Sequence, residues 1–228
     1  MKRIKYLAIV PARGNSKRIK NKNLIKFKKK TLIDITLEQI EKINKINLAI
    51  LTSDSDKILN IGNKYKKCLK LKRPLRISKY NSKTEDAIMH AIRNIEKNYK
   101  IKNIILLQVT SPLRNTKDIN QCIRVYEKKK LSCIFSCYEK KSFIWKKKGK
   151  TFDSINYNYK KRVMSQNMEK IYFENGAIYI FNFEKFKKYK NRIIKPFDIY
   201  LMSEKKSIDL DDHEDLKTLK KYEKKAQC

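Results

Sequence analysis

Short runs of apolar residues alternate along the chain with stretches in which apolar residues recur at a helical period. A continuous apolar run bounded by polar residues is typical of a strand buried in a parallel sheet. Runs of this kind predict strands at residues 6–10, 48–51, 68–71, 104–108 and 132–137. Amphipathic stretches predict helices at residues 32–46, 84–97 and 116–129, and a further helix that begins at the polar segment 52–56 and ends near residue 66. This alternation predicts an α/β fold with a doubly wound, mostly parallel sheet.

The expected ligand site of such a sheet lies at the carboxyl ends of its strands. The loops that follow Val10 and Gln108 are therefore the first places to look for chemistry. With 228 residues, 4 glycines and 4 prolines, the chain has the length of one such domain and no long flexible linker. We expect a single domain over residues 1–228.

The pattern fails between residues 138 and 172. This segment carries several aromatic residues, among them Phe143, Trp145 and Phe152, without a clear period. Two interpretations stay open, a β-rich excursion and an arm that contacts a second subunit, because exposed aromatic side chains call for a surface that covers them. The strand pattern resumes at residues 177–181, and a charged helix is expected from about His213.

The formal net charge is +34, from 57 lysines and arginines against 23 acids. Such a charge fits a nucleic-acid-binding protein or a surface rich in lysine. Runs at residues 28–30, 128–130 and 146–148 show that the charge is spread along the chain rather than gathered on one element. We therefore favour the lysine-rich surface and expect no nucleic-acid partner.

The cysteines and histidines exclude two classes of site. The five cysteines form no Cys-x-x-Cys pair and are expected to be reduced thiols, with Cys133 and Cys137 on one face of a strand. With only His90 and His213 in the chain, a histidine-rich metal site is excluded. The short apolar run near the N-terminus is not a signal peptide, and no run approaches the length of a membrane span. We expect a cytoplasmic protein without a membrane partner.

The loop after the first strand reads Val-Pro-Ala-Arg-Gly-Asn-Ser-Lys-Arg-Ile-Lys-Asn-Lys-Asn over residues 10–23. Backbone N–H groups in a loop of this kind cradle phosphate oxygens, and arginine and lysine supply positive charge. The spacing is that of neither a Walker loop nor the dinucleotide motif Gly-x-Gly-x-x-Gly. The chemistry points to a phosphate site of another class.

An acidic pair, Asp209 and Asp211, precedes the last predicted helix. Carboxylates two residues apart on a strand point to the same side of it. Such a pair suits Mg²⁺, which binds few carboxylates together with phosphate oxygens. The alternative is that these two acids only cap the helix that follows them.

Three more segments complete the pattern: Arg73-Pro74 through Thr84, Leu106-Leu-Gln-Val-Thr-Ser-Pro-Leu-Arg114, and Glu174-Asn-Gly-Ala-Ile-Tyr179. Together with the loop and the acidic pair, they resemble the CMP-N-acylneuraminate (CMP-sialic acid) synthetases, the acylneuraminate cytidylyltransferase family. The resemblance runs from residue 8 to residue 216. It implies a fold of the nucleotide-diphospho-sugar transferase type, a homodimer joined through about 138–172, and Mg²⁺ or Mn²⁺ as cofactor.

The resemblance also implies roles for individual residues. CTP would be bound by Arg13, Gly14, Ser16, Lys17, Lys22, Asn23, Arg73, Ser82 and Thr84, although Thr84 serves equally well as a helix cap. The acceptor sugar would be bound by Gln108, Thr110, Ser111, Arg162, Asn175 and Tyr179. The metal would be held by Asp209 and Asp211. Catalysis would rest on Arg13, Lys22 and Asp211, and Arg114 would either join the site or pin its loop.

The chain departs from the family pattern in four places. Asn15 and Arg18 replace common glycines, and Tyr80 stands where the family has an acid. The family arginine that reaches a partner's site to meet the sugar carboxylate is replaced by Ser165, and Arg162 lies three residues earlier. Either Arg162 substitutes for it or the carboxylate is recognised differently.

The reaction implied by the resemblance is transfer of CMP from CTP to the anomeric hydroxyl of a sialic-acid-type nine-carbon sugar acid, with release of pyrophosphate, for surface glycans such as lipopolysaccharide or capsule. N-acetylneuraminate and relatives such as legionaminate and pseudaminate are candidate acceptors. The alternatives are a CMP-Kdo synthetase, a basic nucleic-acid-binding protein, and a family member that binds CTP without turning it over.

Overall fold

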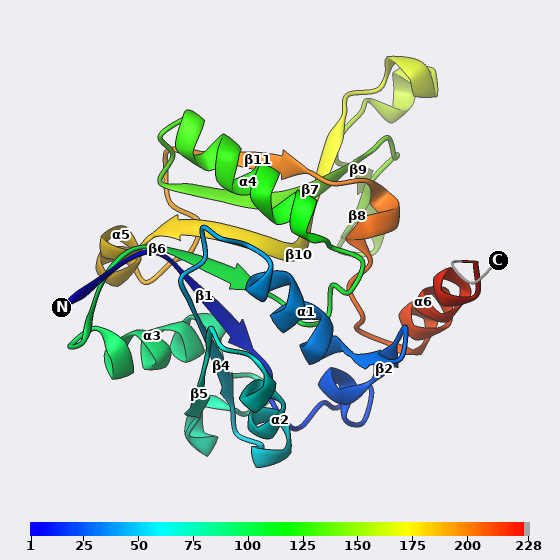
Figure 1. The fold of residues 1–228 in the computed structure, drawn as a ribbon. Coiled ribbons are helices and arrows are strands. Elements are labelled where there is room, and N and C mark those ends of the chain that lie inside the picture. Colours follow the sequence, from blue (N-terminus) through cyan, green and yellow to red (C-terminus); the bar gives the residue numbers. More distant parts are fainter. Residues whose placement is uncertain (226–228) are drawn as a thin grey trace.

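A seven-stranded sheet forms the centre of the molecule in the computed structural model, which describes residues 1–225 (Figure 1). Cys228, one of the expected thiols, lies outside the described residues. In spatial order the strands are β11 (Phe197–Leu201), β7 (Cys133–Lys140), β10 (Ile171–Asn182), β6 (Tyr99–Leu107), β1 (Lys2–Pro11), β4 (Leu48–Ser53) and β5 (Cys68–Lys72). The expected mostly parallel, doubly wound sheet is confirmed.

One strand runs against the others. Strand β10 pairs antiparallel with both β6 and β7, whereas β1, β4, β5 and β6 pair in parallel and β11 is parallel to β7. The register of β10 on β7 shifts between Glu174 and Tyr179, which marks a β-bulge. The bulge lies beside the carboxyl end of β6 and opposite residues 135–137 of β7, which continues beyond it.

Helices cover both faces of the sheet. They are α1 (Leu32–Glu41), α2 (Asp56–Ile61), α3 (Thr84–Ile95), α4 (Thr116–Lys128), α5 (Phe183–Tyr189) and α6 (His213–Lys225). One buried cluster joins the sheet to α1, α2, α4 and α6, and a second joins it to α3 and α5. Cys133 and Cys137 both lie in the second cluster, as their spacing on one strand predicts.

Two helices are shorter than their apolar pattern predicts. Helix α1 begins with a capping box between Thr31 and Asp34 and ends at Glu41, and buried Ile43 and Ile46 continue the pattern in a turn. Helix α2 ends at Ile61, where a 3₁₀ turn, Gly62–Lys64, replaces its expected last turns. Helix α3 begins at Thr84 with Lys83 as its N-cap, so Thr84 is not the cap. No helix of residues 1–225 is long and apolar enough to cross a membrane.

The segment without a clear pattern is β-rich. Strand β7 extends to Lys140, and β8 (Trp145–Lys148) and β9 (Thr151–Ser154) form a separate antiparallel hairpin before β10 begins. A smaller hairpin joins β2 (Lys26–Phe27) to β3 (Lys30–Thr31) after the first loop. Residues 155–170 project away from the sheet (Figure 1). Several large apolar side chains of this excursion are exposed: Trp145, Phe152, Ile155, Tyr159, Val163 and Met164.

Candidate active site

A cavity at the carboxyl ends of the central strands collects residues from four parts of the chain. Its lining includes side chains from the loop after β1, the segment between β5 and α3, the end of β6 and the loop before α6. Among the residues predicted from the sequence, it is lined by Arg13, Lys22, Asn23, Arg73, Ser82, Thr84, Gln108, Thr110 and Asp211. The loops after Val10 and Gln108 therefore do form one site.

The first loop is held in shape by its own polar groups. The Asn23 amide donates to the Arg13 carbonyl at 2.8 Å, and the Gly14 N–H donates to Oδ1 of Asp54 at 2.8 Å. A Cβ at Gly14 would lie 2.8 Å from that of Ser55, so only glycine allows this close approach. The guanidinium of Arg13 donates to the carbonyls of residues 79 and 80, at 3.2 and 3.0 Å. This leaves Arg13 at the cavity wall.

Ser16 and Lys17 line a neighbouring hollow that shares Ser78, Lys79 and Tyr80 with the main cavity. The ammonium of Lys17 lies 3.6 Å from the centre of the Tyr80 ring, a cation–π contact. Tyr80, which stands in place of the acid in the family pattern, thus contacts a cation through the face of its ring. Ser78 and Lys79 also line the main cavity, which the sequence pattern did not predict.

Arg73 is the buried cation of the site. It is 6% exposed, and its Nε and Nη2 atoms are buried without a hydrogen-bond partner among the described residues. Burial lowers the pKa of Arg73, while the nearby Asp54 carboxylate opposes that shift. Buried polar groups in proteins are normally hydrogen-bonded. An oxygen-rich ligand would supply the missing partners.

The Asp211 carboxylate, on the other wall of the cavity, forms ion pairs with two cations. Lys22 lies 2.8 Å from its Oδ1 and Arg18 lies 3.2 Å from its Oδ2. Burial alone would raise the pKa of Asp211, but the hydrogen bond from Lys22 and the two positive charges outweigh it and lower the pKa. Arg18, which replaces a family glycine, thus binds a predicted catalytic residue instead of leaving room for a backbone contact.

Asp209 lies in a different environment. Residues 208–211 are not a strand, so the expectation that both carboxylates point to one side of a strand is wrong. The Leu210 N–H donates to the Thr110 carbonyl at 2.8 Å and folds the loop against the end of β6. Oδ1 of Asp209 is buried with no partner among residues 1–225. Burial raises the pKa of Asp209, against the opposing effects of the Thr110 hydrogen bond and the charge of Lys22.

This donor set fits a hard divalent cation completed by phosphate. The described part of the chain has no group of three or more His, Cys, Asp or Glu side chains placed to hold a metal. Mg²⁺ is bound by one or two carboxylates together with substrate phosphates. The unpartnered oxygen of Asp209 and the accessible carboxylate of Asp211 are consistent with that mode.

A second hollow adjoins the first through Gln108, which lines both. It is lined by Gln108, Tyr138, Glu174, Asn175, Gly176, Tyr179, Ser207 and Asp209. Gly176 has φ +71°, and a Cβ there would lie 3.4 Å from Oε1 of Gln108. Tyr179 is buried and donates its hydroxyl to Glu174. Burial and that hydrogen bond raise the pKa of Tyr179, so its phenol stays protonated.

Asn175 lines this hollow, but its amide is occupied by the protein. Its Oδ1 accepts from the Ser136 hydroxyl at 2.6 Å and from the Ala177 N–H at 3.1 Å. Its Nδ2 donates to Oγ of Ser207 at 2.8 Å. The family resemblance implied that Asn175 contacts the sugar, whereas the structure uses its polar atoms in hydrogen bonds within the protein.

Two predicted sugar contacts lie outside both linings. The Arg162 guanidinium lies 4.3 Å from the centre of the Phe143 ring, on the excursion. Ser111 is 1% exposed, and its hydroxyl has no partner within the described residues. The structure therefore brings neither of them to the lining of the two hollows.

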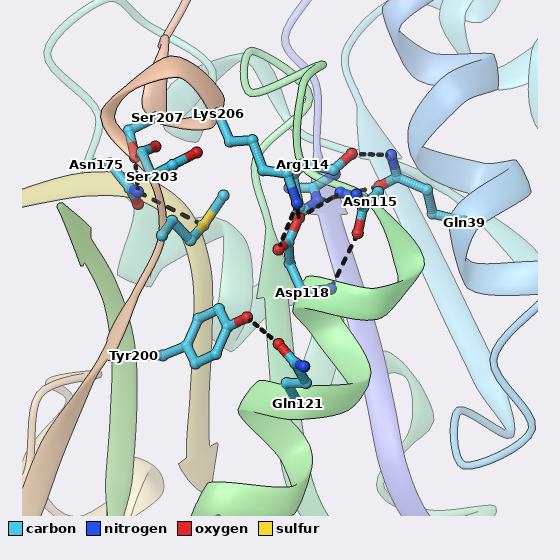
Figure 2. A network of polar contacts seen from close by, with 11 residues as sticks. Gln39, Arg114, Asn115, Asp118, Gln121, Asn175, Tyr200, Ser203, Lys206 and Ser207 are labelled. Atoms are coloured by element: carbon cyan, nitrogen blue, oxygen red, sulfur yellow. Dashed lines mark hydrogen bonds and ion pairs between the residues drawn. The ribbon is translucent and has the colours of Figure 1, made fainter.

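Arg114 is a scaffold residue at the back of the site, in the network shown in Figure 2. It is 1% exposed and donates to the carbonyls of Gln108 at 3.0 Å and Ala177 at 2.7 Å. Its remaining donors reach Gln39 at 3.1 Å and Thr36 at 3.3 Å. Of the two roles that the sequence left open, pinning the loop is the one that these bonds describe.

Taken together, a basic loop on the first strand, an acidic loop before the last helix and a cavity between them define a nucleotidyltransferase. The chain belongs to the cytidylyltransferase family, whose model matches residues 7–228.

Curated relatives and solved structures agree with this class. The chain is 27% identical to the pseudaminic acid cytidylyltransferase of Campylobacter jejuni, over 95% of both chains. It is 29% identical to the N-acylneuraminate cytidylyltransferase of Escherichia coli, over 93% of this chain and 51% of that longer protein. In fold it is similar to CMP:2-keto-3-deoxy-manno-octonic acid synthetase complexed with CTP, with a TM-score of 0.71 at 13% identity over 97% of this chain and 99% of that one.

Proposed function

We propose that this chain transfers CMP from CTP to the anomeric hydroxyl of a sialic-acid-type nine-carbon sugar acid and releases pyrophosphate. The observation that carries the proposal is the pair of hollows that meet at Gln108. One has cations for a triphosphate, and the other has the neutral and acidic hydrogen-bonding groups suited to a polyhydroxylated acceptor. The names of the two relatives, which activate pseudaminic acid and N-acylneuraminate, support the same acceptor class.

On the donor side, Arg13, Lys22 and Arg73 converge on the first hollow. We assign the triphosphate oxygens to Arg13 and Lys22, and nucleotide oxygens to the unpartnered donors of Arg73. Binding would draw Arg13 from the backbone carbonyls of residues 79 and 80 and Lys22 from Asp211. These cations would stabilise the charge that develops on phosphate as the bond to pyrophosphate breaks.

Asp209 and Asp211 are the proposed ligands of Mg²⁺ or Mn²⁺. When bound, the cation would neutralise charge on the phosphate oxygens and lower the barrier to displacement. Lys22 and Arg18 form ion pairs with the Asp211 carboxylate and keep it ionised. The chain's own contribution is to hold one buried and one accessible carboxylate beside the cationic loop.

On the acceptor side, the sugar hydroxyl would attack the α-phosphorus of CTP. The new P–O bond would form as the bond to pyrophosphate breaks, and the hydroxyl proton would pass to solvent. Gln108, which lines both hollows, and Thr110, which lines the first, would orient the acceptor. The protonated phenol of Tyr179 and the carboxylate of Glu174 would read its hydroxyl or amide groups. Because positioning and electrostatics suffice, no covalent enzyme intermediate is invoked.

The sugar carboxylate would be met by Arg162 of a second copy of the chain. Single-subunit geometry places Arg162 on the projecting excursion. The exposed side chains of Trp145 and Phe152, 45% and 63% accessible, give that excursion an apolar surface suited to a partner. We therefore propose a homodimer in which about 138–172 of each subunit completes the other's acceptor site. We place the reaction in the cytoplasm, where the nucleoside triphosphate is made, and its product in surface-glycan synthesis.

The direct test uses purified protein with CTP, Mg²⁺ and a nine-carbon sugar acid, with pyrophosphate release as the readout. Arg13→Ala and Asp211→Ala should each lose about a hundredfold or more in turnover, the range for removing one transition-state contact, while keeping the wild-type thermal transition. Turnover near the wild-type value in either variant would refute its role. Mixing Arg162→Ala with an Asp211→Ala subunit tests the shared site, because only heterodimers would retain one intact site.

A further inference from the structure

The acidic loop, residues 203–211, has little regular structure of its own, yet it is tied to the scaffold at three points. Its only regular element is a 3₁₀ turn, Glu204–Ser207. The Lys206 ammonium lies 3.0 and 3.1 Å from the two carboxylate oxygens of Asp118 on α4. The Asn175 amide donates to Ser207, and the Leu210 N–H donates to the Thr110 carbonyl. Asp209 therefore lies between two of the ties, and Figure 2 shows the first two.

The first tie joins the loop to a buried carboxylate. Asp118 is 5% exposed and also accepts from the Asn115 N–H at 3.0 Å, as part of the capping box that starts α4. Lys206 is the only cation within ion-pair distance of Asp118 in the described chain. Removing one partner of such a pair leaves an uncompensated buried charge, whereas removing both charges is far milder. The pair thus links the position of the loop to α4.

The second tie is made by the Asn175 side-chain amide, whose oxygen already accepts two hydrogen bonds. Oδ1 of Asn175 is held by Ser136 and Ala177, which fixes the direction of the Nδ2 donor toward Ser207. The Ser207 hydroxyl in turn donates to the Ser203 carbonyl at 2.9 Å, so the turn closes on itself. Ser207 precedes Asp209 by two residues. A shift of this turn would move the Asp209 carboxylate directly.

We propose that Lys206 and Asn175 are positioning residues that fix the Asp209 carboxylate for its divalent cation, and so set metal affinity without contacting metal, CTP or sugar. The inference deepens the proposed function and rests on it. Outer residues that orient metal ligands change metal affinity 10–100-fold when they are replaced. Replacing a residue that contributes only to stability would change the thermal transition and leave the metal affinity of the folded protein unchanged.

The test compares Lys206→Met with Lys205→Met, which removes the same charge from the next residue. Lys205 is exposed and makes no ion pair among the described residues, so it controls for net charge. Mn²⁺ affinity is measured from the water-proton relaxation of enzyme-bound Mn²⁺ with CTP and without sugar, which requires no turnover. Lys206→Met should weaken Mn²⁺ binding 10–100-fold and raise the Mg²⁺ concentration for half-maximal turnover equally. Lys205→Met should change neither by more than about twofold.

A double variant separates positioning from stability. Adding Asp118→Asn to Lys206→Met removes the unpaired buried charge, so the thermal transition should recover toward wild type while Mn²⁺ affinity stays low. Lys206→Arg, which keeps the tie, should retain near-normal affinity, and Ser207→Ala should weaken it in the same direction as Lys206→Met. Equal affinities in Lys206→Met and Lys205→Met, or recovery of affinity in the double variant, would overturn the inference. Wild-type enzyme that needs no divalent cation would instead refute the proposed metal site.

Discussion

Replacement of Arg73 by methionine should separate the stability of the empty protein from its affinity for CTP. Arg73 is almost fully buried, and two of its nitrogens lack partners in the described residues. Methionine retains much of the volume of the side chain and removes its charge and donors. Because a buried, unpaired cation costs folding free energy, the ligand-free variant should melt at the wild-type temperature or above it.

The expected loss of affinity follows from those two donors. A hydrogen bond between a charged donor and an oxygen contributes about 1.5–3 kcal/mol, so two of them amount to about 3–6 kcal/mol before compensation. Partial replacement by water reduces this to about 2–4 kcal/mol, which corresponds to a Kd for CTP about 30–1000-fold higher. Ligand binding would therefore be the property that the substitution damages.

The assay is calorimetric titration with CTP alongside thermal unfolding with and without CTP. Arg76→Met is the matched control, because Arg76 lies three residues away, is exposed and does not line the cavity. The control should bind CTP within about threefold of wild type, since an exposed charge contributes little. A variant of Arg73 that melts several degrees lower and still binds CTP normally would show that Arg73 serves the fold, and would refute the reasoning.

Two further substitutions probe the acceptor hollow and the fold. Gly176→Ala places a side chain at φ +71° and 3.4 Å from Gln108, so it should cost about 1–3 kcal/mol of stability, seen in urea unfolding, and should raise KM for the sugar more than KM for CTP. Glu127 has a pKa of about 2, because hydrogen bonds from Lys45, Lys5 and Tyr6 outweigh the raising effect of burial. A lowered folded-state pKa stabilises above the unfolded value of about 4.5, and that stability is lost as pH falls toward 2. Glu127→Gln should therefore be about 1 kcal/mol less stable at pH 7, after discounting for screening, with the difference vanishing near pH 2; an unchanged difference at both pH values would contradict this.

The parallel part of the fold could be predicted because its strands are short apolar runs between amphipathic helices. The direction of β10 could not be predicted, because residues 177–181 form the same kind of apolar run in an antiparallel strand. Helix α1 shows a second limit. Ile43 and Ile46 continue the apolar period and are buried, but they lie in the turn after the helix. The apolar pattern therefore marks buried positions beyond the end of the helix.

The site was predictable where motif residues follow strands directly. Arg13 and Gln108 lie at strand ends, and the parallel sheet brings them together. Long-range contacts were out of reach: the pairing of Arg18 with Asp211 and of Lys206 with Asp118 joins residues far apart in the chain, with no local signal. For Asn175 the motif identified the place, while its use in the scaffold is visible only in three dimensions.

The measurement that tests the central proposal most directly is pyrophosphate release from CTP and Mg²⁺ against a panel of acceptors: N-acetylneuraminate, legionaminate, pseudaminate and the eight-carbon acid Kdo. The paired hollows and the named relatives predict release with at least one nine-carbon acid and none with Kdo. Pyrophosphate release with Kdo alone would contradict the assignment. So would the absence of release with every acid, from folded protein that still binds CTP.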